Sequence, residues 1–127
     1  AVLAATGGEG VDLIVDQVSG PVANQNLAAT RVLGRIVNVG RLGGGMAEFN
    51  FDLHALRRIE YIGVTFRTRS PEEIRSLVAA VERDLGVAIK EGILSLPIDK
   101  VFALSEASSA LSYMEANQHF GKIVLKV

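Results

Sequence analysis

Short apolar runs alternate with amphipathic stretches along the whole chain. The run VDLIVDQV at residues 11–18 is β-branched and almost continuously apolar, which predicts a strand covered on both faces, as in parallel sheets. Between such runs the apolar positions recur with helical spacing. We expect strands near 11–17, 35–39, 59–66, 98–104 and 121–127, and helices over about 21–33, 71–91 and 105–117. A short helix should run through about Arg57, with Asp52 as its cap.

Proline, glycine and helix-capping residues support these boundaries. Pro21 suits a first helical position, where its missing N–H costs nothing, and Gly34 suits a helix exit. The stretch SPEE at residues 70–73 is typical of a helix start, because Ser70 can cap and Glu73 can close a capping box. Strands and helices alternate throughout, so the pattern predicts an α/β layered fold with parallel strand pairs.

Composition narrows the function classes. The 127 residues suffice for one modest domain, and 13 basic against 14 acidic residues give no reason to expect binding to nucleic acid or to a membrane surface. The absence of cysteine excludes disulfides and thiolate zinc sites, and only two histidines occur, so we predict no metal site. Without a long apolar run or a secretory signal, we expect no membrane span and a cytoplasmic protein.

Several segments, in this order and at this spacing, resemble medium-chain dehydrogenases/reductases, closest to the quinone oxidoreductase and zinc-type alcohol dehydrogenase branches. The segments are GVDLIVDQVSG, GRIVNVG, YIGVTFR, SPEEI and FGKIVLKV. The resemblance implies an α/β fold with a partial Rossmann-like parallel sheet. Residues 1–96 would be the C-terminal half of the nucleotide-binding domain. Residues 97–127 would be a closing strand–helix–strand segment that packs on the family's catalytic domain.

The same resemblance implies that the chain is the C-terminal part of a longer enzyme. The parent would use NAD or NADP to pass hydride to or from a small carbonyl, alcohol or quinone. Catalytic groups, and zinc where it is used, would lie in the preceding domain. We therefore name no catalytic residue, expect no cofactor to remain bound to this chain alone, and expect the chain alone to be inactive. Family dimers extend their sheet through the strand that corresponds to residues 59–66, so a homodimer through this strand is expected.

Candidate cofactor residues lie at the predicted strand ends, because ligands of open α/β sheets bind outside the carboxyl ends of strands. By resemblance, the backbone near Val39 and Val64 would bind the nicotinamide carboxamide, and Gly40 would let the ring approach. Lys122, at the start of the last strand, would reach the pyrophosphate as a point charge. The predicted cofactor residues are Val18, Ser19, Val39, Gly40, Val64, Phe66 and Lys122. The structural alternative is that these residues form core, turns and an exposed lysine.

Other chemistry-bearing residues have weaker support. Arg41 and Arg67 also follow strand ends and could touch phosphate or ribose, although solvated side chains are the commoner case. No second catalytic residue lies at a recognisable motif spacing from His54, His119, Tyr61 or Tyr113, so nothing supports any of them as a general acid or base. The glycines at 43–45 lack the lysine of a phosphate loop. A different class stays open: a non-catalytic α/β association module that uses its exposed sheet edges.

Overall fold

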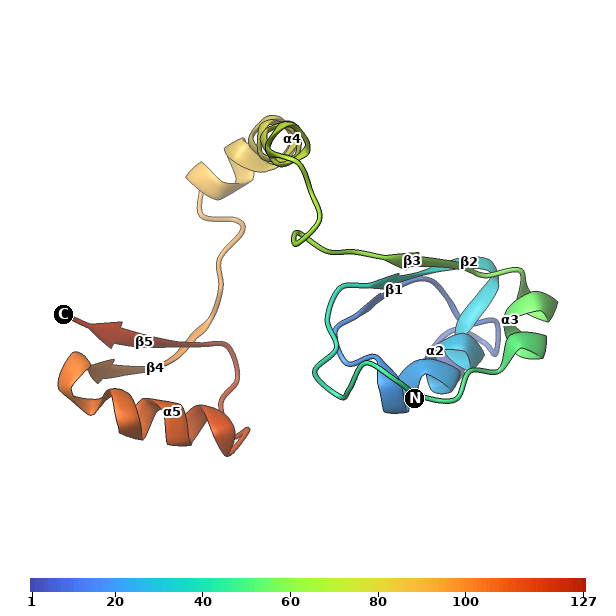
Figure 1. Cartoon of the computed structure of the whole chain (residues 1–127), viewed down its shortest axis with the longest axis horizontal. Coiled ribbons are helices and arrows are strands. Elements are labelled where there is room, and N and C mark those ends of the chain that lie inside the picture. The colour runs from blue at the N-terminus through green and yellow to red at the C-terminus, as the bar shows by residue number, and fades with distance from the viewer. The chain divides into compact units, whose positions relative to one another are not determined.

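The structure, a computed structural model, describes residues 1–127 and divides into two compact units, Ala1–Ser70 and Pro71–Val127. Each unit contains one parallel sheet (Figure 1). The predicted α/β class and its parallel strand pairs are confirmed. The functional division proposed at residues 96 and 97 stays a prediction. None of the helices is both long enough and apolar enough to cross a bilayer.

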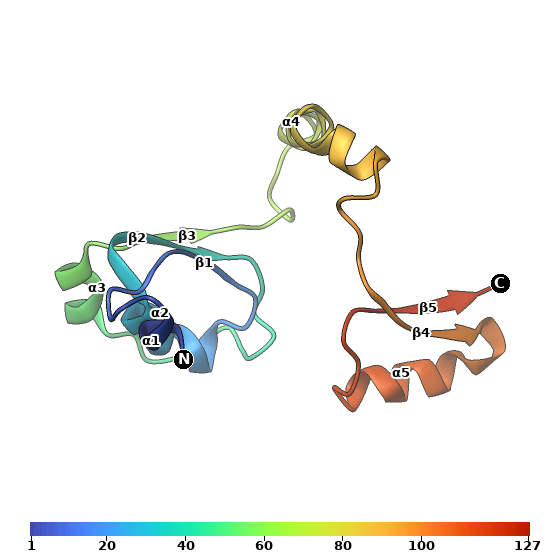
Figure 2. The ribbon, with the colours of Figure 1, turned by 180° about the vertical axis from the view of Figure 1, so that it is seen from behind.

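The sheet of the first unit has three strands. They are β1 (Val11–Asp16), β2 (Thr30–Asn38) and β3 (Glu60–Gly63), in the order β1-β2-β3, with both pairs parallel. The helical elements of this unit are α1 (Val2–Ala5), the 3₁₀ turn η1 (Gly20–Val22), α2 (Ala23–Ala29) and α3 (Phe51–Arg57). Figures 1 and 2 show α1 and α2 on the same side of this sheet.

The core of the first unit lies where α2 and α3 meet the sheet. Leu27 and Ile36 are fully buried, and Ile59 is nearly so. Ile14 and Tyr61 pack against this cluster from the flanking strands. Because successive strand residues face opposite sides, Leu13 and Val15 lie on the other face of β1, where both are more than half exposed. Within this unit, the expectation that β1 is covered on both faces is therefore not met.

The largest departure from the sequence prediction concerns the helix expected over 21–33. It begins as the turn η1, continues as α2 and ends at Ala29, and Thr30 already pairs with Val11 of β1. The Thr30 hydroxyl donates to the carbonyl of Asn26 at 2.7 Å. Leu33 has a left-handed φ of 64°, which no helix interior adopts. The amphipathic pattern continues past Ala29, but strand pairing overrides it.

Two smaller predictions were also wrong in detail. The strand expected over 59–66 ends at Gly63, and a turn follows in which the Arg69 amide donates to the carbonyl of Phe66. The cap of α3 is Asn50 rather than Asp52, because the Asn50 side chain accepts a hydrogen bond from the Leu53 amide at 2.8 Å. Asp52 instead lies in the first turn, where a negative charge suits the helix dipole.

The second unit contains a strand–helix–strand motif. Its elements are α4 (Pro71–Lys90), β4 (Ile98–Ala103), the 3₁₀ turn η2 (Leu104–Glu106), α5 (Ala107–Glu115) and β5 (Lys122–Lys126). Strands β4 and β5 pair in parallel, and α5 packs on them. Phe102 and Ala110 are the buried residues of this unit. The helices and strands predicted for this region are confirmed to within a few residues.

Candidate functional site: the carboxyl ends of the first sheet

The site begins with the turn that follows β1. Asp16 ends this strand, and its side chain is buried at 3% exposure. Its Oδ1 atom accepts hydrogen bonds from the amides of Val18 and Ser19, both at 2.9 Å. Its main-chain carbonyl accepts from the amides of Val39 and Gly40, at 2.8 and 3.1 Å. One residue therefore fixes both the turn after β1 and the carboxyl end of β2.

The charge state of Asp16 follows from these contacts. Burial raises the pKa of the carboxyl, but the amides of Ser19 and Val18, followed by the side chains of Asn38 and Asn26, lower it by more. The net pKa lies below the ordinary 3.8, so the group is a carboxylate at neutral pH. Nearby, burial and the Asp16 charge raise the pKa of Tyr61, and Arg41 opposes this shift. Sequence reasoning missed Asp16, although an acidic residue that ends an apolar strand before a turn is a readable signal.

Two predicted cofactor residues, Ser19 in this turn and Gly40 after β2, have conformational roles. Ser19 adopts φ 61° and ψ −143°, a backbone conformation that glycine tolerates far better than serine. Gly40 lies so close to the preceding turn that a Cβ atom there would come within 2.6 Å of the Gln17 carbonyl oxygen. Glycine is thus required at position 40 by packing of main chain on main chain. The predicted approach of a ring to Gly40 stays a prediction.

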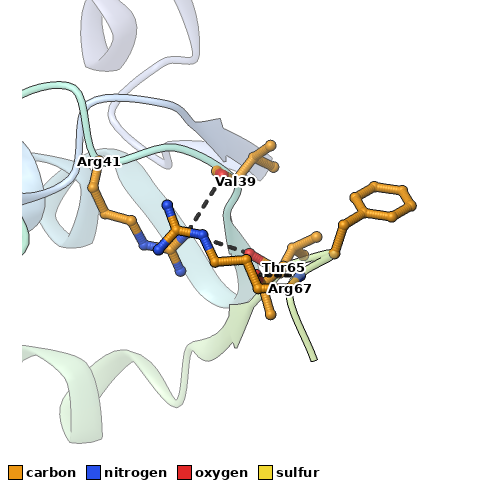
Figure 3. A pocket seen from close by; sticks show the side chains of 6 residues that line it. Val39, Arg41, Thr65 and Arg67 are labelled. Carbon is orange, nitrogen blue, oxygen red and sulfur yellow. Dashed lines mark hydrogen bonds between the residues drawn. The ribbon is translucent and has the colours of Figure 1, made fainter. Parts of the chain in front are cut away.

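A pocket of about 580 Å³ opens where β2 and β3 end (Figure 3). This volume lies within the range of small-molecule sites, about 300–1,000 Å³. The pocket collects three of the predicted cofactor residues, Val39, Val64 and Phe66. Val18, Ser19 and Gly40 belong to the same end of the sheet but do not line the pocket. The lining residues are Val39, Arg41, Val64, Thr65, Phe66 and Arg67.

Arg41 makes the most informative contact in this pocket. Its Nη1 atom lies 3.5 Å from the carbonyl oxygen of Val39 and 3.3 Å from that of Val64. These carbonyls follow two neighbouring strands, so they converge on a single nitrogen donor (Figure 3). Both contacts are long for N–H···O hydrogen bonds, whose usual length is about 2.7–3.2 Å, and are correspondingly weak. The two acceptors are therefore available to a better-placed donor.

Lys122 belongs to the second unit. It opens β5 in register with Ile98, its amide donates to the Pro97 carbonyl at 2.8 Å, and the residue is exposed. Its predicted contact with a pyrophosphate stays a prediction.

The remaining polar residues offer no cluster that could hold a metal ion. The chain has no cysteine, and no group of three His, Asp or Glu side chains is placed to hold a metal ion. Tyr113 donates to Asp99 at 2.9 Å on the surface of the second unit. The Phe120 amide and then the Tyr113 hydroxyl lower the pKa of Asp99. These are contacts between the strand and helix of one motif, and the pocket that this unit forms is lined by apolar residues.

The chain matches the family described as zinc-binding dehydrogenase over residues 1–125. It is 32% identical over 126 residues to a mycocerosic acid synthase-like polyketide synthase of Mycolicibacterium smegmatis, covering 96% of this chain and 6% of that protein. It is 32% identical over 127 residues to a 2-haloacrylate reductase of a Burkholderia species, covering 94% and 36%. The chain thus spans about a third of the length of the reductase and a far smaller part of the polyketide synthase.

A solved NAD-dependent alcohol dehydrogenase has the same fold over 99% of this chain and 34% of its own, with a TM-score of 0.77 and 27% identity. The resemblance seen in the sequence is confirmed. The donor set of this chain does not fit zinc, because it has no cysteine and no group of three His, Asp or Glu side chains placed to hold a metal ion. The parallel strands, their shared carboxyl ends and the match over residues 1–125 show that this chain belongs to the zinc-binding dehydrogenase family.

Proposed function

We propose that this chain forms the nicotinamide side of the cofactor site in an NAD(P)-dependent oxidoreductase. One observation supports the proposal above the others: the carbonyls of Val39 and Val64 converge on one weakly held nitrogen donor, Nη1 of Arg41. A carboxamide NH₂ group carries two N–H donors on one nitrogen and can replace that contact. The site also lies outside the carboxyl ends of parallel strands, where dinucleotides bind in open α/β sheets.

Different residues of the pocket would contact different parts of a nicotinamide. The two carbonyls would fix the carboxamide, and with it the face that the ring presents. Phe66, which is exposed, would offer an apolar surface beside the ring. Arg41 would leave the carbonyls when the carboxamide arrives. The bound cofactor would supply the chemistry by hydride transfer from its ring to the substrate, which also takes up a proton while the cofactor is oxidised.

The substrate class follows from the same family membership. The parent enzyme would reduce a small carbonyl compound or quinone, or oxidise an alcohol, and a relative named 2-haloacrylate reductase adds conjugated carbon–carbon double bonds to this range. We expect the chain alone not to oxidise NAD(P)H, because none of the side chains that line the pocket of the first unit is a His, Asp, Glu or Tyr that could act as general acid or base.

A titration with NADH and with ADP-ribose tests the cofactor role, since the two ligands differ by the nicotinamide. We expect NADH to bind weakly and to move the NMR signals of the amides at 39–41 and 64–67. ADP-ribose should leave these amides unchanged. The Arg41→Ala variant should bind NADH at least as well as the original chain, because it removes a competitor for the carbonyls. Equal responses to both ligands at these amides would refute a nicotinamide site here.

We also propose a homodimer through residues 59–66. Strand β3 is an edge of its sheet, and its only charged residue, Glu60, pairs with Arg35 of β2. The Val64 amide donates to the Asn38 carbonyl of β2 at 3.1 Å. Because neighbouring amides of a strand point to opposite sides, those of Tyr61 and Gly63 face the open edge. Unpaired edge groups of this kind invite pairing with a second strand.

Light scattering tests this proposal, which would hold equally for an association module. We expect a dimer that the Gly63→Pro change weakens, because proline removes an amide donor from the outer edge. Gly45→Pro serves as the control, since Gly45 lies in a loop with open space around it. A monomer at high micromolar concentration before any substitution would refute the dimer.

A further inference from the structure

The pocket at the ends of β2 and β3 is lined by two positively charged side chains and by no negatively charged one. Arg41 and Arg67 both line it, and none of the other lining residues carries a charge. Figure 3 shows their side chains extending toward one another from the ends of neighbouring strands. Two guanidinium groups that share one small pocket repel each other unless an anion lies between or beside them. The arrangement therefore lacks a negative partner of its own.

Neither arginine has such a partner elsewhere in the structure. The surface arginines Arg31, Arg35 and Arg75 form ion pairs with carboxylates at 2.6–2.7 Å, whereas Arg41 and Arg67 form none. Arg41 uses one nitrogen for two long contacts with carbonyls. A guanidinium has five N–H donors in a planar fork, so most of its donors are free for a ligand.

We infer that Arg41 and Arg67 form a subsite for the carboxylate of a short unsaturated or carbonyl-bearing acid. A planar fork matches a carboxylate through two parallel hydrogen bonds. The apolar lining residues Val39, Val64 and Phe66 suit the short carbon skeleton attached to such a group. A substrate held in this way would place its reactive carbon beside the ring that the two carbonyls orient.

This inference rests on the proposed cofactor site and makes the role of Arg41 twofold. Without cofactor the guanidinium contacts the carbonyls of Val39 and Val64; once the carboxamide takes that place, the guanidinium is released toward the substrate. A phosphate is the competing occupant. The phosphates of a dinucleotide bind at helix N-termini in Rossmann folds, whereas Arg41 and Arg67 follow the ends of strands.

Crotonate and crotonamide provide a matched pair of probes, because they share a carbon skeleton and differ in the charge of one group. We expect NMR titration of the chain to show crotonate binding about tenfold more tightly than crotonamide, a typical effect of charge-assisted hydrogen bonds. Amides at 41 and 65–67 should respond. Arg41→Gln and Arg67→Gln should each remove most of the preference. Arg83→Gln is the control, since Arg83 pairs with Asp84 on α4.

Three results would overturn the subsite: equal binding of the two probes, an unchanged preference in both pocket variants, or inorganic phosphate binding more tightly than crotonate at these amides. Amide spectra confirm that each variant is folded. The NADH titration separates this inference from the cofactor role. Loss of Arg41 should weaken the binding of crotonate but not the binding of NADH. A negative result in one titration therefore leaves the other titration interpretable. Crotonate discrimination without any NADH response would keep the anion subsite and refute the cofactor site.

Discussion

The two units contain the same motif, a strand, a helix and a parallel strand, yet they differ in how far it is completed. In the first unit, β1, α2 and β2 gain a third strand, and Leu27 and Ile36 become fully inaccessible. In the second unit, β4, α5 and β5 remain a pair of strands under one helix. There Leu111 and Met114 stay about half exposed. The shared strand–helix–strand motif alone therefore forms neither a fully buried core nor a polar site.

The ends of the strands differ in the same way. Strand β1 ends in a buried carboxylate that holds two amides of its turn and, through its carbonyl, the end of β2. Strand β4 ends at Ala103, whose amide donates to the exposed Glu106 at 3.0 Å as the chain turns directly into η2. Only the first arrangement leaves converging carbonyls beside a pocket. The third strand supplies the second of these carbonyls, since Val64 follows β3.

The largest expected effect is a loss of stability that should be much greater in the first core than in the second. Leu27→Ala should lower the free energy of unfolding by about 3 kcal/mol, because it opens a cavity at a fully buried position. Leu111→Ala, the same change on the matching helix of the second unit, should cost no more than about 0.5 kcal/mol, since the side chain is already 57% exposed. Chemical denaturation measures both. Equal losses would contradict the contrast between the units.

The Asp16→Asn change tests whether one carboxylate organises the carboxyl ends. We expect a loss of about 1–3 kcal/mol, because two amides would exchange a charged acceptor for a neutral one inside the protein. Asp99→Asn is the matched change in the second unit. Asp99 also accepts two hydrogen bonds, from Tyr113 and from the Phe120 amide, but it lies on the surface, so the loss should be smaller. A larger loss at Asp99 would reverse this ranking.

The pH dependence of stability follows from the same group. The folded-state pKa of Asp16 lies below its ordinary value of 3.8, so its stabilising contribution is complete well above pH 3.8 and disappears as the pH falls through the lowered pKa. Unfolding measured from pH 6 to pH 2 should show this loss in the original chain. The Asp16→Asn variant should show a shallower dependence, and identical curves would contradict the assignment.

A smaller effect of opposite sign is expected at Ser19. Ser19→Gly should raise the free energy of unfolding by about 0.5–1 kcal/mol, because glycine relieves an unfavourable backbone conformation while adding some entropy to the unfolded chain. Asn117→Gly is the counterpart in the second unit. Asn117 has a φ of 52°, in a region that asparagine tolerates, so its replacement should have less effect. Thermal unfolding compares the two, and a destabilised Ser19→Gly variant would contradict the strain.

How much the sequence reveals depends on whether a feature is local. The apolar run at 11–18 located β1, and the SPEE stretch at 70–73 located the start of α4, because those signals act within a few residues. The start of β2 was hidden: Val32 and Leu33 continue an amphipathic pattern, while the pairing of Thr30 with Val11 decides the conformation. The contact of Arg41 with Val64 was equally hidden, since it joins residues 23 apart in sequence across two strands.

The proposed site requires that the carbonyls of Val39 and Val64 bind the carboxamide of a nicotinamide cofactor. Labelling the chain with ¹³C at these carbonyls and adding NADH tests it most directly. We expect both carbonyl signals to move together on addition of NADH, ADP-ribose to leave them in place, and Arg41→Ala to preserve the response. Carbonyl signals that stay unchanged while NADH perturbs residues elsewhere would contradict it.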